Sequence, residues 1–345
     1  MDPRSFSQAV VPLWWGDRAG LLDFVRLGAF AACDASGRLI ASAGDPTLPA
    51  YLRSSAKPFQ AIAFLRRGLD VKLGLTSADI ACACASHEGQ DVHAESARRI
   101  LAAGGNTESD LLCGTHPLSN KDLERRIALG ELEVTPIRNN CSGKHSAMLA
   151  VCRHEGWPTA AYTDLAHPLQ QENLATLATF AGLDARAIVT GVDNCTVPTF
   201  ALPLAAAATA FARLLDPRDV PTDLADAGGR AARAMMAHPH MVGGDGRVDT
   251  TLMELTRGRV VIKTGANGYH CAAGRPPGGG DVIGFAMKLA GAEVESQKAA
   301  VTISCMERVG LLSGDEAATL LARHAPPQRN CRGAVVGEMG AVPSG

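Results

Sequence analysis

The order of the expected secondary-structure elements constrains the fold of this chain more than any single motif. Strand-like segments stand toward the two ends of the chain, at 24–45 and at 259–288, and a long, mostly helical middle separates them. Strict alternation of strands and helices is absent, which disfavours a doubly wound parallel sheet. The pattern predicts an α+β fold with an antiparallel sheet flanked by helices and an additional, mainly helical region.

The first strand-like segment predicts a hairpin, because two apolar stretches flank the turn-forming residues 34–37. Pro58 fits a helix only in its first turn, so one helix is expected to begin near Ser54 or Ser55. Ser119 is the expected cap of another, which ends at Gly130. Further helices are expected at 91–103, 144–154, 167–180, 223–237, 296–312 and 315–324, and one more begins at residue 204. Strands are expected at 259–263, 282–288 and 331–339. A Gly/Pro loop at 274–280 is expected to join the strands at 259–263 and 282–288.

The length and composition exclude several classes of protein. At ~150 residues per domain, 345 residues suggest about two domains or lobes. We expect a single catalytic unit, 1–345, with a sheet lobe at about 20–60 and 245–345 and a helical lobe at about 61–244. The net charge of −2 argues against nucleic acid or a membrane surface as a partner. No signal-type segment opens the chain, and its longest apolar stretch, 200–215, is shorter than the ~20 residues of a membrane span. A soluble, cytoplasmic protein is expected.

The chain contains ten cysteines. Without an export signal, these indicate free thiols or metal ligands rather than disulfides. Most lie beside apolar residues and are expected to be buried and inert. Cys141 and Cys195 differ because they lie in the polar, turn-like segments 139–144 and 191–195. No C-x-x-C or H-x-x-x-H spacing is present, so the sequence encodes no ordinary zinc finger.

Two short motifs together point to nucleophilic catalysis. Ser54 and Lys57 are spaced to lie on one face of a helix. Burial in an apolar helix start lowers a lysine pKa, and the neutral amine could accept a serine proton. Lys263-Thr264-Gly265 ends an expected strand, and S-x-x-K followed by K-T-G is the signature of penicillin-recognising enzymes. Ser86 could supply the third group, although no Ser-Asp-Asn is present. Taken singly, Ser54 and Lys57 would be interpreted as a helix cap and a surface lysine, and Lys263 as a lysine on an edge strand.

A third polar segment, 139–146, reads NNCSGKHS and opens an expected helix. Backbone N–H groups at the start of a helix suit an anion or an oxyanion. The alternative is a simple N-terminal cap supplied by Ser142. His238-Pro239-His240 is interpreted as a turn rather than a metal site.

Six ordered segments resemble the class 3, or Rhizobium-type, L-asparaginase family, also called the asparaginase II family. The resemblance extends from about residue 20 to the end of the chain. The segments are 53–57 (RSSAK), 83–89 (ACASHEG), 139–146 (NNCSGKHS), 191–195 (GVDNC), 238–242 (HPHMV) and 263–266 (KTGA).

The resemblance implies a fold like that of serine β-lactamases and glutaminases, a homodimer, and hydrolysis of L-asparagine to L-aspartate and ammonia. It also implies a Ser–Lys nucleophilic mechanism with a nearby zinc ion, and it leaves open whether the zinc is catalytic or structural. The nucleophile is either Ser54 or Ser86. The implied residues are the pairs Ser54 with Lys57 and Ser86 with Lys263, the zinc ligands Cys141, Lys144 and Cys195, and the substrate-binding or supporting residues Arg53, His87, Asn140, His145, Asp193, Thr264 and Gly265.

Two other functions are compatible with these residues. One is a β-lactamase-fold serine amidohydrolase or glutaminase that acts on another amide, and the other is a non-catalytic protein that binds an amino acid or a metal. The missing Ser-Asp-Asn counts against penicillin chemistry, and the two Ser–Lys pairs count against binding alone. Asn194 stands where glycine is expected and Asn267 where an acidic residue is expected. These departures concern substrate preference more than reaction class.

Overall fold

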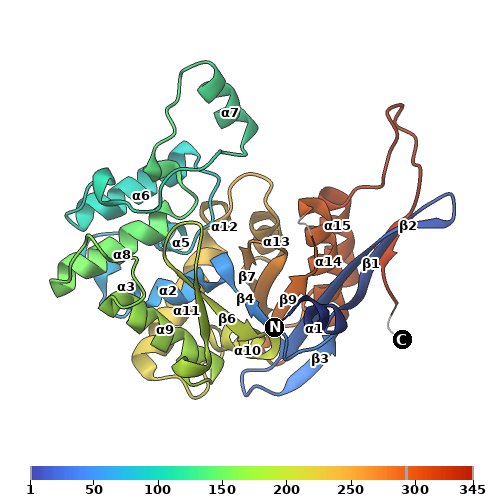
Figure 1. Cartoon of the computed structure of the whole chain (residues 1–345), viewed down its shortest axis with the longest axis horizontal. Helices are drawn as coiled ribbons and strands as arrows, with labels where there is room; N and C mark the ends of the chain where they lie inside the picture. The colour runs from blue at the N-terminus through green and yellow to red at the C-terminus, as the bar shows by residue number, and fades with distance from the viewer. Residues whose placement is uncertain (1, 292–293, 344–345) are drawn as a thin grey trace. The chain divides into compact units, whose positions relative to one another are not determined.

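The computed structural model describes residues 2–291 and 294–343 and divides into two compact units (Figure 1). Unit 1 comprises Met1–Leu52, Leu202–Arg218 and Gly265–Gly345, and unit 2 comprises Arg53–Ala201 and Asp219–Thr264. That these units act as one catalytic unit, with the lobe boundaries expected above, stays a prediction. None of the helices in the described part of the chain has the length and apolar character needed to cross a membrane.

Unit 1 is built on an antiparallel sheet in the order β10-β1-β2-β9-β8, with β3 also paired to β2. Strands from both ends of the chain, coloured blue and orange in Figure 1, therefore lie side by side. The strands are β1 (Val11–Arg18), β2 (Leu21–Cys33), β3 (Leu39–Ala43), β4 (Pro49–Tyr51), β8 (Tyr269–Gly274), β9 (Ile283–Leu289) and β10 (Met339–Ala341), and the helices are α1 (Pro3–Gln8), α10 (Leu204–Arg213), α14 (Glu295–Arg308) and α15 (Gly314–His324).

The predicted hairpin at 24–45 is confirmed by β2 and β3. The turn between them depends on Asp34, whose Oδ1 accepts hydrogen bonds from the backbone N–H groups of Ser36 (2.9 Å) and Arg38 (3.0 Å). Gly37 completes the turn at φ +90°, a conformation that L side chains rarely adopt.

Both faces of this sheet are covered by helices. On one face α10, whose sequence LAAAATAFAR is mostly small, lies directly on β9: a methyl group at Gly284 would be 1.9 Å from the carbonyl oxygen of Ala208. On the other face, the rings of Phe285 and Phe30 have centroids 5.8 Å apart, and Arg308 of α14 lies 5.6 Å from the Phe30 centroid. This double cover explains why β8 is buried along its whole length.

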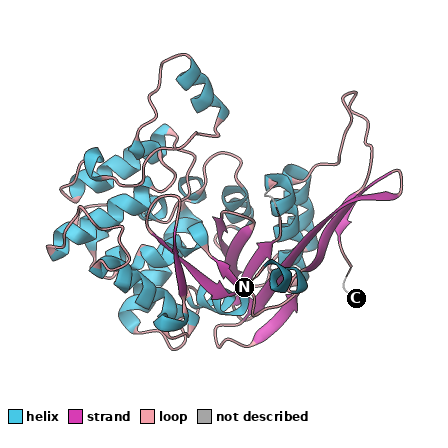
Figure 2. Ribbon diagram, viewed as in Figure 1, coloured by secondary structure: helices cyan, strands magenta, loops and turns pink. Residues whose placement is uncertain are grey.

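Unit 2 is mostly helical (Figure 2), and α5, α6 and α8 pack against one another. Its two-stranded antiparallel hairpin joins β5 and β6. The elements of this unit are η1 (Arg53–Ala56), α2 (Lys57–Gln60), α3 (Ile62–Leu65), α4 (Leu69–Lys72), α5 (Ser77–Ala83), α6 (Asp91–Ala103), η2 (Glu108–Asp110), α7 (Lys121–Ala128), η3 (Pro136–Arg138), α8 (Ser142–Glu155), α9 (Pro168–Ala181), η4 (Ala185–Ala187), β5 (Val189–Val192), β6 (Pro198–Pro203), α11 (Thr222–Ala237), α12 (Pro239–Val242), α13 (Val248–Thr256) and β7 (Val260–Gly265). In sequence, β6 ends two residues, and β7 one residue, beyond the bounds of the unit.

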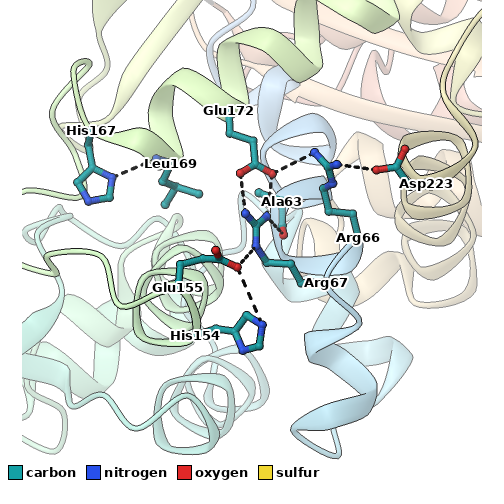
Figure 3. Close-up of polar contacts among 9 residues, drawn as sticks. All are labelled: Ala63, Arg66, Arg67, His154, Glu155, His167, Leu169, Glu172 and Asp223. Atoms are coloured by element: carbon teal, nitrogen blue, oxygen red, sulfur yellow. Dashed lines mark hydrogen bonds and ion pairs between the residues drawn. The ribbon is translucent and has the colours of Figure 1, made fainter.

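An ion-pair network joins α8 and α9 to the chain after α3 (Figure 3). Arg67 donates to both carboxylate oxygens of Glu172 on α9 at 2.7 and 2.8 Å, and to Glu155 at the end of α8 at 2.7 Å. Arg66 reaches Asp223 of α11 at 2.6 Å. The bond with Glu172 raises the pKa of Arg67 against the opposing effect of burial. The network connects four segments of unit 2 through charged hydrogen bonds.

The α+β class and most of the expected helices are confirmed, and α6 has the predicted bounds 91–103. Three predictions need correction. Asn120 rather than Ser119 caps α7, with its side chain accepting from two backbone N–H groups. The strand β8 was not predicted, because a strand buried on both faces shows no alternating pattern, so the Gly/Pro loop follows β8 and not β7. The last strand begins at Met339 instead of spanning 331–339.

Candidate active site

The segment with Ser54 and Lys57 folds as short helical pieces, η1 followed by α2 and α3. Every residue of α2 is buried, and Lys57 is only 1% exposed. Pro58 is accommodated near the start of α2, as its position in the sequence predicts. The fold therefore places a lysine amine in the interior of unit 2.

The amine of Lys57 is held by three oxygen atoms. Its Nζ donates to the backbone carbonyls of Ala85 and, at 3.1 Å, Asn140, and it lies 2.9 Å from Ser86 Oγ. The two carbonyls can only accept, so they orient two N–H bonds of the amine. The remaining position of the nitrogen faces the Ser86 hydroxyl, and a proton can be exchanged between these two groups.

The predicted pairs were Ser54 with Lys57 and Ser86 with Lys263, and both stay predictions. Among the residues that the structure describes, the Ser54 hydroxyl makes no hydrogen bond, and Lys57 bonds to Ser86 instead. Ser54 stands three residues before Lys57 in the same helical segment. The structure thus brings Lys57 within hydrogen-bonding distance of the second candidate serine.

Ser86 is positioned by the segment after α5. Its backbone N–H donates to the carbonyl of Val242, at the end of α12, at a distance of 3.0 Å. The next residue, His87, accepts at Nδ1 from the N–H of Gly89 (3.1 Å), so its proton lies on Nε2 and is donated to Ser142 Oγ (3.1 Å). Burial lowers the pKa of His87 well below its ordinary value and keeps the ring neutral. Ser142 opens α8 and bonds to His87, so it is not the helix cap that the alternative interpretation required.

Lys263 lies near the end of β7 and is fully buried. Its Nζ donates to the carbonyl of Thr264 at 2.9 Å and lies 3.5 Å from Asp249 Oδ2. Burial lowers the pKa of Lys263 to about 7, with Asp249 opposing this shift. Ser55 Oγ donates to the Lys263 carbonyl at 2.7 Å and thereby ties η1 to β7. A lysine with this pKa can hold or release a proton near neutral pH.

Thr264 and Gly265, predicted as supporting residues, follow directly in β7. Thr264 donates from both its backbone N–H (2.9 Å) and its hydroxyl to the carboxylate of Asp249. Gly265 is the last residue of β7 and belongs to unit 1.

The three predicted zinc ligands lie together in the interior of unit 2. Lys144 Nζ is 3.1 Å from Cys195 Sγ, and Cys141, Lys144 and Cys195 are at most 5% exposed. The bond from Cys195 lowers the pKa of the Cys141 thiol well below its ordinary value, with burial opposing it. Burial disfavours a charged Lys144, but Cys195, Cys141 and Asp193 raise its pKa.

The two cysteine sulfurs of this set fit zinc, which prefers thiolate ligands, whereas a lysine nitrogen is an unusual third donor. Lysine must lose its proton before it can bind a metal. In the described part of the chain no three His, Cys, Asp or Glu side chains cluster as a metal site. The predicted set contains only two such residues, with lysine as the third donor.

The turn that carries Cys195 is tied to the residue before Ser54. Arg53 donates through Nε to Asp193 Oδ1 (2.8 Å) and through Nη2 to Asn194 Oδ1 (2.7 Å). Burial opposes the charge of Asp193, but Lys144 and Arg53 hold the pKa of its carboxyl below its ordinary value. Arg53 has φ +50° and Thr196, just after the cysteine, has φ +76°. Non-glycine residues rarely adopt this conformation, so both turns are strained.

His145 and Asn140 complete the predicted set. His145 Nδ1 is 2.7 Å from the hydroxyl of Tyr162, which accepts from the Leu112 N–H. The other ring nitrogen, Nε2, has no hydrogen-bond partner among the described residues. Burial lowers the pKa of His145 well below its ordinary value. Asn140 contributes its carbonyl to Lys57, and its N–H donates to His116 Nε2 at 2.9 Å.

Sequence reasoning missed Asp249 and Ser55, which hold Lys263 and the strand around it. No motif or spacing connects Asp249 to Lys263, since the rest of helix α13 and a turn separate them in the sequence. Ser55 is adjacent to Ser54, and only its burial, at 0% exposure, distinguishes its role.

The sequence profile of the family described as L-asparaginase II matches residues 16–341, a range that contains every predicted site residue. No curated protein matches the chain at a significant level. Among solved structures, a β-lactamase from Sphaerobacter thermophilus DSM 20745 matches at 14% identity with a TM-score of 0.39, over 84% of this chain and 92% of that one.

Proposed function

Because the chain belongs to the L-asparaginase II family, we propose that it hydrolyses L-asparagine to L-aspartate and ammonia by a Ser–Lys mechanism. The observation that carries the proposal is the partly buried contact of 2.9 Å between Lys57 Nζ and Ser86 Oγ. Binding alone requires no lysine amine oriented toward a serine hydroxyl, whereas nucleophilic catalysis does.

In the first step, a serine oxygen attacks the side-chain carbonyl carbon of asparagine while a lysine amine takes the serine proton. The C–N bond then breaks and the nitrogen leaves as ammonia, carrying a proton delivered through the other serine. Water attacks the resulting ester and gives a proton back to the group that protonated the ammonia, while the first lysine returns its proton to the serine oxygen as the ester bond breaks and aspartate leaves. Every group therefore ends in the protonation state in which it began.

Two assignments of the serines are compatible with this scheme. In one, Ser54 is the nucleophile, and Ser86 with Lys263 delivers the proton to the leaving nitrogen. In the other, Ser86 attacks after giving its proton to Lys57, and Ser54 assists departure. The hydrogen bond to Ser86 supports the second assignment, and the helical spacing of Ser54 and Lys57 supports the first.

We also propose that Cys141, Lys144 and Cys195 hold a zinc ion. When bound there, the metal would supply a positive charge and Lewis acidity. Metal analysis of purified protein tests this: about one zinc per chain is expected, and less than half as much after Cys195→Ser. A control substitution of the buried Cys305 of unit 1 should leave the zinc content unchanged. Equal zinc in all three proteins would contradict the ligand set.

The central experiment measures ammonia release from L-asparagine and L-glutamine for wild type, Ser54→Ala and Ser86→Ala, with exposed Ser109→Ala as the matched control. We expect release from L-asparagine by wild type and control, and a loss of 10³-fold or more in kcat for the variant without the nucleophile. Folded, zinc-loaded wild type that releases ammonia from neither amide would refute the proposed activity. Equal turnover of both amides, or turnover of a chromogenic cephalosporin, would instead favour a broader amidohydrolase.

The family resemblance further supports a homodimer, and light scattering of the purified protein tests it. A mass near twice 35.9 kDa is expected.

A further inference from the structure

The carboxylate of Asp249 is a buried group to which the proposed reaction assigns no role. Asp249 is the second residue of α13 and is 3% exposed. Its Oδ2 accepts from the Thr264 N–H at 2.9 Å, and its Oδ1 accepts from the Thr264 hydroxyl. Burying a carboxylate costs free energy unless it is paired or hydrogen-bonded, so its partners explain why it is tolerated here.

The same carboxylate lies beside the amine of Lys263. Asp249 Oδ2 is 3.5 Å from Lys263 Nζ, and that nitrogen also donates to the Thr264 carbonyl at 2.9 Å. One side chain of α13 thus contacts two consecutive residues of β7. Because the Thr264 bonds fix the carboxylate and the carbonyl fixes the amine, the two charged groups are held at a defined separation.

Several other charges surround Lys263. Lys57 and Arg247 disfavour its protonated form, as does burial, which has the largest effect, whereas Asp249 and Cys141 favour it. Asp249 is the carboxylate that forms an ion pair with this amine. Without it, a protonated Lys263 would be a buried cation near two other cations, which is strongly unfavourable.

We propose that Asp249 is a positioning residue that holds the Lys263 amine at the end of β7 and supplies the counter-charge for its protonated form. The contact itself is independent of the reaction, but its consequence for turnover rests on the function proposed above. In the assignment with Ser54 as the nucleophile, Lys263 receives a proton and passes one on, so it must be stable both with and without the proton. Asp249 makes the protonated state accessible near neutral pH.

The direct test follows the titration of Lys263 by NMR. The chain contains seven lysines, so protein labelled with ¹³C at lysine Cε gives few signals, and Lys263→Met identifies the one of interest. In Asp249→Asn, which keeps the shape of the side chain and removes its charge, we expect the titration midpoint of Lys263 to fall by about one pH unit or more. An unchanged or higher midpoint would overturn the proposal.

Two matched variants separate charge from structure. Thr264→Val removes one hydrogen bond of Asp249 but keeps its charge, so the midpoint should move far less than in Asp249→Asn. Asp70→Asn removes another buried carboxylate of unit 2, which pairs with Arg230, and should leave the midpoint in place. An equal fall in all three variants would mean that loosened packing, and not the counter-charge, sets the midpoint.

If Asp249→Asn does not fold, Asp249→Glu still decides the question. It keeps the charge, so the midpoint should stay within about half a unit, and a fall of one unit or more would overturn the proposal. The kcat–pH profile of a folded Asp249→Asn should move to lower pH by the same interval, with a smaller change in KM. If the wild type releases no ammonia, only the proposed function is refuted. The proposed role of Asp249 is tested separately, because the NMR titration midpoints are measured without substrate.

Discussion

Gly143, the second residue of α8, offers a sharp test of how closely α8 packs on α5. A methyl group at this position would lie 2.3 Å from the carbonyl oxygen of Cys82 and 2.7 Å from its carbonyl carbon and Sγ. The obstacle is backbone, which has no alternative rotamer, so one of the two helices must move. α8 begins between Cys141 and Lys144, and α5 leads to Ser86, so the movement affects both halves of the site.

The magnitude follows from two opposing effects. Replacing glycine by alanine in a helix stabilises by up to about 1 kcal/mol, whereas forcing an extra methyl group into a packed interior costs about 1–3 kcal/mol or more. A contact of 2.3 Å is far inside normal packing, so the upper part of that range applies. We expect Gly143→Ala to lower the free energy of unfolding by about 2 kcal/mol and to reduce kcat.

Urea unfolding followed by circular dichroism measures this change. The matched control is Gly229→Ala in α11, where the nearest atom to the added methyl is the end of the flexible Arg233 side chain, 3.0 Å away. This control should be as stable as wild type or up to about 1 kcal/mol more stable. The close approach of α8 and α5 would be refuted if Gly143→Ala matched the control in stability and in activity.

Substitutions at three residues probe further features of unit 2. Arg67→Met should lower the free energy of unfolding by about 2 kcal/mol or more, because it leaves the carboxylates of Glu155 and Glu172 without their shared cation; a change below 0.5 kcal/mol in urea would contradict this. Arg53→Gly should be more stable than Arg53→Ala by about 1 kcal/mol, since both lose the ion pair but only glycine relieves the positive φ. The pKa of Lys263 is about 7 in the folded protein, against an ordinary value of 10.5. Between pH 7 and 10.5 the lysine of the unfolded chain therefore holds a proton that the folded protein has released. The stability of wild type relative to Lys263→Met should therefore rise as the pH is raised from 7 to 10, and a flat difference would argue against the lowered pKa.

Short sequence patterns predict the helices and hairpins whose formation depends on residues close together in the chain. Helix α6 matches its predicted bounds because its apolar residues recur with helical spacing. The hairpin of β2 and β3 follows from its turn chemistry. Strand β8 escapes prediction because both of its faces are covered, and a run such as YHCAAG then carries no alternation.

The candidate site shows the same division between local and long-range information. The sequence indicates that Ser54, Lys57, Ser86 and Lys263 belong together, yet helical spacing alone pairs Lys57 with Ser54. Its contact with Ser86 depends on where the fold places α2 and the segment after α5, which no local spacing encodes. Asn194, a departure from the family pattern, accepts a hydrogen bond from Arg53. Such a contact becomes visible only when distant segments are placed in three dimensions.

The seating of α10 on β9 also limits how this chain can change over evolutionary time. At Gly284 the helix backbone already occupies the space of the first side-chain carbon, so no nearby side chain can shrink to make room. A larger residue there would require α10 to shift as a whole, which a single mutation does not provide. Position 284 should therefore be among the slowest to diverge among descendants of this sequence, while exposed positions in the loop after β8, such as Pro277 and Gly278, should change more readily.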